Sequence, residues 1–268
     1  MIIDAKAAQR IAQQLEDSEQ SRAQISQISQ QYPGMTVADS YAVQKAWVDL
    51  KLQKGQKIWG HKVGLTSRAM QLSSNIDEPD YGVLFDYMFY EDGATLPFER
   101  FIVPRVEVEL AFILKKDLQG PNVRITDVYA ATEYVLPALE IIDARFHQLC
   151  PDTGVTRKVF DTIADNAANA GVVLGGRPII VDSIDMRWAG CILSRNGQIE
   201  ETGLAAGVMN HPANGIVWLA NKLAEHEVSL KAGQVILSGS FTRPVSAQPA
   251  DVFHADYGPL GAIQCRFE

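Results

Sequence analysis

The sequence predicts an α+β fold, in which a small helical N-terminal segment precedes a larger body of mixed β-sheet. Its 268 residues, 47% of them hydrophobic and 21% charged, are enough to bury a full core. Apolar residues recur at helical spacing in the first part of the chain, whereas short β-like runs separated by Gly, Pro and Asn begin at Ile58. Because these runs do not alternate strictly with helices, a mixed fold is expected rather than a doubly wound sheet.

The N-terminal segment, residues 1–55, is expected to be helical. Residues 4–30 carry Ile and Leu at helical spacing, which predicts one or two amphipathic helices, and a Pro-Gly pair then breaks the pattern. Thr36 and Asp39 form a capping-box pattern, and an apolar helical face follows them. A single larger domain is expected over residues 56–268.

The larger domain is predicted from β-like runs and interrupting helices. The runs are "IWGHKVGL", "RVEVELAFIL", "AGVVLGG", "GCILSRNGQIEE", "AGQVILSGS" and "GAIQCRFE". Inside the fourth run, Asn196 and Gly197 form a favoured two-residue turn, which predicts a β-hairpin. The interrupting helices are expected at 125–133, 161–170 and 212–224.

Charge and cysteine content narrow the expected partners. The net charge of −8 comes without a basic stripe, which argues against nucleic acid or an anionic membrane and favours a small molecule. The polar N-terminus lacks the apolar core of a secretory signal, and no stretch is long enough to span a bilayer. Cys150, Cys191 and Cys265 lie far apart and outside any CxxC spacing, as expected for reduced thiols. A cytoplasmic location is therefore expected.

Two glutamates lie two positions apart in an otherwise apolar run, "PRVEVELAFIL". Strand alternation places Glu107 and Glu109 on one face, with their α-carbons roughly 6 to 7 Å apart. Glu140 is the only charge in the apolar run "YVLPALEII". Buried carboxylates without a partner would take up protons or destabilise the fold, so a positive partner is expected between them.

A hard divalent cation is one candidate for that partner. Glutamate oxygens are the ligands that Mg²⁺ or Mn²⁺ prefers, and no His or Cys cluster offers the softer ligands that zinc favours. Two alternatives stay open at this point. The glutamate pair could lie on the solvated face of a half-exposed sheet, or a buried glutamate could pair with Arg105 or Arg145.

Several motifs together resemble the hydratase and decarboxylase branch of the fumarylacetoacetate hydrolase superfamily. They are "GHKVGLTS" at 60–67, "EPDYG" at 78–82, "PRVEVELAF" at 104–112, "PALEIIDAR" at 137–145, "FDTIADNAANAG" at 160–171 and "HPANGIVWLANKL" at 211–223. The resemblance covers nearly the whole chain. It implies a rolled, mixed β-sheet body of the C-terminal type of this superfamily behind a small helical N-terminal part.

The resemblance also implies a metal-binding catalytic centre in residues 56–268. The family's metal ligands fall on Glu107, Glu109 and Glu140, its active-site lysine on Lys62, and the acidic companion of that lysine on Asp80. The cofactor would be Mg²⁺, with Mn²⁺ as a substitute. Lys62 would shuttle protons or hold an oxyanion, with its pKa lowered by partial desolvation and a nearby cation, and Asp80 would orient it.

Lys62 and Asp80 also have ordinary structural interpretations, as a surface lysine on an edge strand and as a turn residue beside a proline. The glycines at 60 and 64 favour the functional interpretation, because they permit close approach of the backbone to a ligand. The neighbours His61 and Leu65 are therefore expected to bind substrate.

Further substrate-binding residues are expected in two later motifs. Asp161 and Asn166 could contact the substrate or order a metal-bound water, although helix capping and packing would explain them equally well. Ser240 and Arg243 lie in a loop after a strand, where substrate groups often bind.

If the substrate is a dicarboxylate, its distal end needs a cation, which a guanidinium can provide in bidentate fashion. The candidates are Arg243, Arg145 and Arg68.

The branch implies an activity on 2-oxo acids, whose carboxylate and keto oxygens can chelate one metal through two open positions. The expected activity is that of a hydro-lyase: addition of water to 2-oxo-hept-4-ene-1,7-dioate (2-hydroxyhepta-2,4-diene-1,7-dioate), giving 4-hydroxy-2-oxoheptane-1,7-dioate in homoprotocatechuate degradation, a route of aromatic hydrocarbon catabolism. Alternatives are decarboxylation of a 2-oxo-3-enedioate of the 4-oxalocrotonate type, hydration of 2-hydroxypenta-2,4-dienoate, and hydrolysis of a carbon-carbon bond. A non-catalytic partner of a pathway enzyme is the alternative from another class.

The resemblance also implies a large homo-oligomer built from dimers. Association with the pathway decarboxylase is a further expectation, and the small-molecule partner would be a 2-oxo dicarboxylate.

Overall fold

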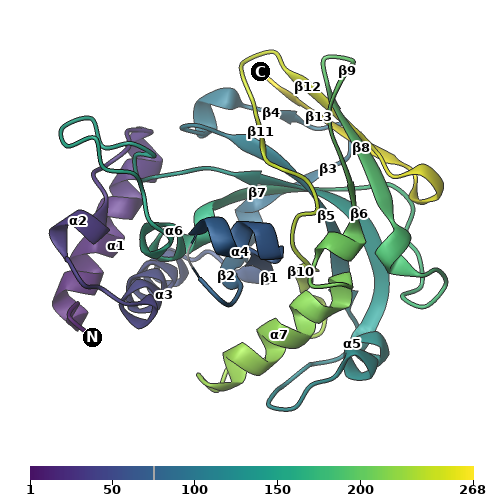
Figure 1. Ribbon diagram of the computed structural model, residues 1–268, viewed down its shortest axis with the longest axis horizontal. Helices are drawn as coiled ribbons and strands as arrows, with labels where there is room; N and C mark the ends of the chain where they lie inside the picture. Colours follow the sequence, from purple (N-terminus) through teal and green to yellow (C-terminus); the bar gives the residue numbers. More distant parts are fainter. Residues whose placement is uncertain (75) are drawn as a thin grey trace.

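The computed structural model describes residues 1–74 and 76–268 and confirms the α+β class. The N-terminal helices lie on the left of Figure 1, a large mixed sheet crosses the centre, and a smaller sheet lies at the upper right. Two helices lie at the lower right, α5 (Ile125–Ala131) and α7 (Pro212–Ala224). Among the described residues, no helix has both the length and the apolar character needed to cross a membrane.

The N-terminal helices are α1 (Ala5–Ser21), α2 (Ile28–Gln31) and α3 (Val37–Gln53). The predicted capping box begins α3: the Thr36 side chain accepts from the Asp39 N–H, and the Asp39 side chain accepts from the Thr36 N–H. Apolar side chains of α1 and α3, including Leu15 and Trp47, share a core with Ala164 of α6 (Val159–Ala164). This shared core attaches the helical layer to the edge of the larger domain.

The larger sheet runs in the order β2-β1-β10-β5-β6-β7-β3, with β11 paired to β5 off this path. Its strands are β1 (Ile58–Gly64), β2 (Asp80–Phe85), β3 (Phe89–Glu91), β5 (Arg105–Leu114), β6 (Thr132–Ile142), β7 (Asn169–Leu174), β10 (Val235–Leu237) and β11 (Val245–Ser246). The sheet is mixed, because β1 pairs with β10 and β3 with β7 in parallel while its other pairs are antiparallel.

The smaller sheet runs in the order β4-β13-β12-β8-β9. Its strands are β4 (Thr95–Leu96), β8 (Gly190–Arg195), β9 (Gln198–Leu204), β12 (Val252–Asp256) and β13 (Ala262–Phe267). The predicted hairpin is confirmed: Asn196 and Gly197 join β8 to β9 with φ of 54° and 79°. Positive φ at both positions is the geometry of a type I′ turn, which matches the twist of the two strands.

The remaining helical segments are short. They are α4 (Arg68–Ser74) and 3₁₀ turns at Asp86–Met88, Phe98–Arg100, Asn166–Ala168, Met186–Trp188, Ala205–Gly207 and Gly258–Leu260.

The helix predicted at 161–170 is wrong in extent. α6 ends at Ala164, and Asn166, Ala167 and Ala168 have φ of 51°, 51° and 59°, which a right-handed helix does not allow. The side chain of Asn166 accepts from the N–H of Val83 and donates to its carbonyl. These bonds hold the chain in a sharp turn, so that β7 begins at 169. The helix predicted at 212–224 is confirmed, and that at 125–133 ends two residues earlier, where β6 begins.

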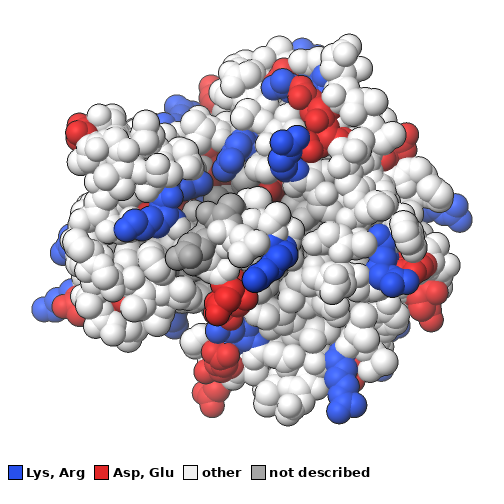
Figure 2. Space-filling model, in the orientation of Figure 1, with Lys and Arg blue, Asp and Glu red and all other residues white. Residues whose placement is uncertain are grey.

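The strand β5 separates the core of the molecule from its functional face. Val108, Leu110 and Phe112 point to one side and pack with side chains of the smaller sheet, such as Phe253. Glu107 and Glu109 point to the opposite side, as strand alternation predicts. Figure 2 shows both acidic and basic side chains on the face in view.

Candidate metal centre and cleft

Three glutamates from two paired strands converge on the functional face of the larger sheet. In the antiparallel register of β5 and β6, Glu107 lies opposite Glu140, and Glu109 lies opposite Ala138. One carboxylate oxygen from each of Glu107, Glu109 and Glu140 lies within 4.8 Å of the others. The convergence depends on this register, since a shift by one residue would turn Glu140 to the other face.

Burial and mutual repulsion make this group of acids electrostatically unfavourable on its own. Glu140 and Glu109 have 0% and 1% of their surface exposed, and Glu107 is partly open to the cleft. Burial raises the pKa of Glu107 to about 7 and that of Glu109 well above its usual range, and the charge of Glu140 adds to both shifts. The three carboxylates therefore require positive charge in order to stay ionised together.

Individual hydrogen bonds orient the carboxylates and leave other oxygens free. Oε1 of Glu140 accepts from Nδ2 of Asn169 at 3.0 Å and lies 3.2 Å from Nζ of Lys62. Its Oε2 is buried without a hydrogen-bond partner among the described residues. Oε2 of Glu109 accepts from the N–H of Gly239 at 2.7 Å. Oriented hard oxygens with unused acceptor capacity fit a divalent cation.

Two features of the surrounding backbone support this arrangement. The hydroxyl of Tyr257 lies 2.6 Å from the carbonyl of Ala138 and 3.1 Å from that of Glu109, and so links β6 to β5. Gly239 has φ of 116°, and a Cβ there would lie 2.4 Å from Oγ1 of Thr66. A larger residue would therefore displace the N–H group that orients Glu109.

Lys62 and Asp80 come from the neighbouring strands β1 and β2. Asp80 lies opposite Gly64, and a Cβ on Gly64 would lie 2.1 Å from Oδ1 of Asp80, so the glycine makes room for this carboxylate. Lys62 and Asp80 are both buried, with 3% and 2% of their surface exposed. Lys62 thus lies beside the carboxylate of Glu140, and the charge of Asp80 also acts on it.

The pKa of Lys62 is raised, whereas desolvation was expected to lower it. Burial alone would lower the pKa of Lys62, but Glu140 and Asp80 outweigh burial and raise it. Burial raises the pKa of Asp80, and Lys62 opposes that shift. Among these side chains Lys62 is therefore a charged hydrogen-bond donor, and a divalent cation beside it would act in the opposite direction.

A cleft of about 1250 Å³ opens onto Lys62, Asp80, Glu107 and Glu109. It lies between the segment that follows β1, the segment that enters α6, and the loop that follows β10. Its volume is more than a small organic acid needs, and its lining includes charged and polar side chains from each of these segments.

The cleft is also lined by some of the predicted substrate-binding residues. Leu65 lines it in a left-handed conformation, with φ of 54°. Ser240 also lines it, and its hydroxyl donates to the carbonyl of Thr242. Arg243 lies at the rim, with 81% of its side chain exposed, and pairs with Glu201 at 2.8 Å.

Three other predicted substrate-binding residues lie outside the cleft lining. The carboxylate of Asp161 accepts from the backbone and hydroxyl of Ser29 and from the N–H of Lys158, which favours the capping interpretation. The amide of Asn166 is used by the backbone of β2, as described above. His61 is buried, and burial lowers its pKa to about 4, so it is neutral. These positions favour structural roles for all three.

The arginines predicted to bind a distal carboxylate also differ in their access to the cleft. Arg145 has 1% of its surface exposed and pairs with Asp165 at 2.5 Å beneath the helical layer, where a substrate does not reach it. Glu140 is paired with Lys62, not with an arginine. Arg68 lies on α4, and its side chain is exposed outside the cleft lining.

Three further side chains in the cleft or beside the glutamates were not among the predicted site residues. Asn169 was assigned to a helix with Asn166, yet it begins β7 and reaches Glu140 across the β6–β7 pair. Arg157 lines the cleft from an irregular loop, where no periodicity indicates a direction. Arg105 was expected only as a possible ion-pair partner of a buried glutamate, although it shares strand parity with Glu107 and Glu109.

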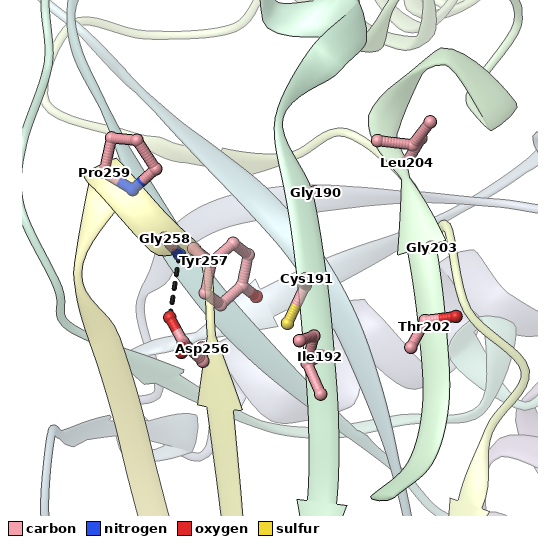
Figure 3. A pocket seen from close by; sticks show the side chains of 10 residues that line it. All are labelled: Gly190, Cys191, Ile192, Thr202, Gly203, Leu204, Asp256, Tyr257, Gly258 and Pro259. Carbon is pink, nitrogen blue, oxygen red and sulfur yellow. Dashed lines mark hydrogen bonds between the residues drawn. The ribbon is translucent and has the colours of Figure 1, made fainter.

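A second hollow, of about 650 Å³, lies on the smaller sheet between β8, β9 and the turn after β12. Figure 3 shows Cys191 and Tyr257 beside each other there, and Asp256 bonded to the N–H of Gly258. The hydroxyl of Tyr257 already bonds backbone carbonyls. Asp256 is the one carboxylate that lines this hollow within the described chain, so the cleft is the better candidate for an active site.

Several known proteins are similar to this chain over nearly its whole length. No family model matches the chain. The 2-oxo-hept-4-ene-1,7-dioate hydratase of Escherichia coli is 62% identical over 257 residues, covering 96% of each chain. The 2-keto-4-pentenoate hydratase of Paraburkholderia xenovorans is 37% identical over 96% of this chain and 93% of its own.

Among solved structures, the 4-oxalocrotonate decarboxylase of Pseudomonas putida G7, complexed with magnesium and adipate, superposes with a TM-score of 0.93. It is 33% identical, and the match covers 99% of this chain and 98% of that one.

Proposed function

We propose a function from the premise that this chain belongs to the fumarylacetoacetate hydrolase superfamily, in its branch of hydratases and decarboxylases. The proposed function is a divalent-metal-dependent hydratase that converts 2-oxo-hept-4-ene-1,7-dioate to 4-hydroxy-2-oxoheptane-1,7-dioate. The observation that carries the proposal is the convergence of Glu107, Glu109 and Glu140 beside Lys62 in a chain 62% identical to a hydratase of this substrate.

The proposed metal is Mg²⁺, with Mn²⁺ as a substitute, held by Glu107, Glu109 and Glu140. Support comes from the oxygen-only ligand set and from the magnesium in the 33% identical decarboxylase. When bound, the metal supplies positive charge to a 2-oxo acid and polarises its keto group.

The reaction moves two protons and one water. In 2-hydroxyhepta-2,4-diene-1,7-dioate, the 2-hydroxyl loses a proton and carbon 5 gains one, which gives the conjugated 2-oxo-3-ene. A water molecule then adds hydroxyl to carbon 4 and a proton to carbon 3. Both steps develop negative charge on the oxygen at carbon 2, so a fixed donor near that oxygen accelerates both.

Lys62 is proposed as that donor and as the group that moves protons. Its ammonium is buried next to Glu140 and opens onto the cleft, so it can reach a bound substrate without competition from bulk water. Asp80 is proposed to orient Lys62 and to relay protons. Its Oδ1 is buried without a partner among the described residues, which leaves it free for such a role.

The test is to incubate the purified protein with Mg²⁺ and 2-hydroxyhepta-2,4-diene-1,7-dioate and to identify the product by mass. Gain of one water supports the hydratase. A parallel incubation with the 2-oxo-3-enedioate 4-oxalocrotonate tests the decarboxylase, the activity named for the 33% identical structure. Loss of carbon dioxide from that substrate, without gain of water by the first, would replace the hydratase with the decarboxylase. If both substrates stay unchanged, with Mg²⁺ shown to bind, both activities are refuted and a non-catalytic partner is favoured.

A homo-oligomer assembled in the cytoplasm is also part of this proposal. Its support is exposed apolar surface around the β8–β9 hairpin, where Trp188, Ile192, Ile199 and Leu204 are 70%, 44%, 67% and 44% exposed. Free thiols at all three cysteines fit a reducing compartment. Light scattering of the purified protein tests the oligomer, and a monomer at micromolar concentration would refute it.

A further inference from the structure

Two arginines face the cleft without an acidic partner. Arg105 and Arg157 both line it. In the described parts of the chain, 1–74 and 76–268, neither guanidinium forms an ion pair within 4.0 Å or a hydrogen bond. Arg243 and Arg145 differ, because their charges are already paired with Glu201 and Asp165.

Arg157 is held in place although its charge is unpaired. Its backbone N–H donates to the carbonyl of Gln148 at 2.9 Å, and its Nη1 is buried without a hydrogen-bond partner. Burial lowers the pKa of Arg157, the charge of Asp165 opposes this shift, and the like charge of Arg105 adds to it. Arg157 is half-buried, and its buried Nη1 has no partner among the described residues, so an anion bound in the cleft beside both arginines would satisfy it.

The position of Arg105 relates this anion site to the metal centre. Arg105 and Glu107 lie two residues apart on the same face of β5, so their α-carbons are roughly 6 to 7 Å apart. A seven-carbon dicarboxylate has six bonds between its terminal carbons, which at about 1.2 Å of rise per bond gives roughly 7 Å. A substrate whose 2-oxo acid end lies at the glutamates is therefore long enough for its other end to reach the side chain of Arg105, and Arg157 lines the same cleft.

We infer that Arg105 and Arg157 form the subsite for the distal carboxylate of the substrate, and that this subsite selects dicarboxylates over monocarboxylates with the same reactive end. The inference rests on the proposed function for the identity of the reactive end. It assigns specificity to residues other than Arg243, Arg145 and Arg68, which the sequence alone favoured. Two guanidinium groups around one carboxylate satisfy both oxygens and relieve the repulsion between the arginines.

The kinetic test compares two substrates that differ at the distal end. Wild type, Arg105→Met and Arg157→Met are assayed with 2-hydroxyhepta-2,4-diene-1,7-dioate and with 2-hydroxypenta-2,4-dienoate, which has no distal carboxylate. For each variant we expect kcat/KM for the dicarboxylate to fall on the order of 100-fold, mainly through KM, because a charge-assisted bond is lost. For the monocarboxylate, kcat/KM should change by less than about 3-fold.

A binding test separates the subsite from the reaction. Heptanedioate and heptanoate are titrated calorimetrically into the Mg²⁺-loaded protein; each offers one carboxylate to the metal, and only the first offers a second. Wild type should bind heptanedioate about 100-fold more tightly, and Arg157→Met should bind the two acids alike. Arg157→Lys should recover part of the preference. Because the lost charge is unpaired, the melting temperature of Arg157→Met should equal or exceed that of wild type.

The matched control is Arg187→Met, which removes the same charge from an exposed pair with Asp185 outside the cleft lining and should leave both preferences unchanged. Equal losses on both substrates would overturn the inference, since they indicate a general role. A dicarboxylate-specific loss in Arg243→Met alone would also overturn it. If wild type hydrates neither substrate, the proposed function fails, and the titrations still decide whether the arginines bind a distal carboxylate.

Discussion

The molecule has two clusters of charged side chains, one in the helical layer and one in the cleft. Both combine lysines with acidic side chains, but they differ in the balance of positive and negative charge. In the helical cluster, Glu16 pairs with Lys51 at 2.9 Å and with Lys54 at 2.7 Å, and Lys51 also pairs with Glu19. Two lysines thus face two glutamates. Trp47 donates a further hydrogen bond to Glu16.

The cleft cluster lacks this balance. Lys62 pairs with Glu140, and the charges of Asp80, Glu107 and Glu109 also act on it. The pKa of Glu16 is lowered, whereas the pKa values of Glu107, Glu109 and Asp80 are raised. A balanced cluster stabilises the fold by itself, and an unbalanced one is stable only with a cation that the protein binds. The difference distinguishes a structural cluster from a functional one.

The largest predicted effect removes one carboxylate from the unbalanced cluster. Glu140→Gln keeps the shape of the side chain but removes the carboxylate, the proposed ligand, that faces both Lys62 and the other glutamates. We expect kcat/KM to fall at least about 1,000-fold, because the metal loses a ligand and its charge stabilisation is lost. Steady-state rates at saturating Mg²⁺ measure this.

The same variant should be at least as stable as wild type in EDTA, because repulsion among the carboxylates decreases. Activity within 10-fold of wild type would mean that Glu140 is not a metal ligand.

Lys62→Met tests the single cation of the same cluster. We expect kcat to fall on the order of 100- to 1,000-fold, since a positioned proton donor is lost. Calorimetric affinity for Mg²⁺ should be retained or increased, because the variant removes a positive charge 3.2 Å from Glu140. Loss of metal binding together with activity would assign Lys62 to the structure of the site instead of to the reaction.

Metal addition should affect the two clusters differently. Mg²⁺ at 100 times its dissociation constant stabilises the native state by about 2.7 kcal/mol, which raises the melting temperature by roughly 5 to 10 °C in a protein of this size. Glu140→Gln should lose this increase, and Glu16→Gln should keep it. An equal melting temperature of wild type in Mg²⁺ and in EDTA would contradict a metal site in the unbalanced cluster.

The sequence predicts the contacts between residues that are close along the chain better than those between residues that are far apart in it. Strand alternation is local, so it correctly placed Glu107 and Glu109 on one face. The convergence of Glu140 with them depends on the register between β5 and β6, and β6 was not among the predicted strands. The association of Glu140 with Glu107 and Glu109 was expected from its place as the only charge in an apolar run and from the family resemblance.

Contacts between residues far apart in the sequence also explain why Asp161 was expected to bind substrate but lies outside the cleft lining. Asp161 has the residue type of a ligand, but Ser29, 132 positions away, occupies both of its oxygens. The helical cluster depends in the same way on the packing of α1 against α3, which brings Lys51 to Glu16. Balance between charges is a property of the packed structure, and composition does not reveal it.

The smallest predicted effect concerns Glu16 in the balanced cluster. Burial alone would raise its pKa, but bonds from Lys54 and Lys51 outweigh burial and lower it to about 2. Since this value lies below the usual 4.5 of a glutamate, the stabilisation is complete above pH 4.5 and is lost as the pH falls toward about 2. Glu16→Gln should therefore lower the free energy of unfolding by about 1 to 2 kcal/mol at pH 7.

Urea unfolding at pH 7, 5, 4 and 3.5 measures this difference, which should shrink once the pH falls below 4.5. Asp17→Asn is the matched control, because Asp17 is exposed and bonds one neighbouring glutamine, Gln13; its unfolding free energy should change by less than about 0.5 kcal/mol. Both variants should keep kcat/KM within about 3-fold of wild type. A charged pair that only supports the fold must lose its contribution to stability when its carboxylate is protonated. A stability difference for Glu16→Gln that does not change with pH would therefore contradict the distinction between the two clusters. A loss of activity in this variant without a loss of stability would contradict it as well.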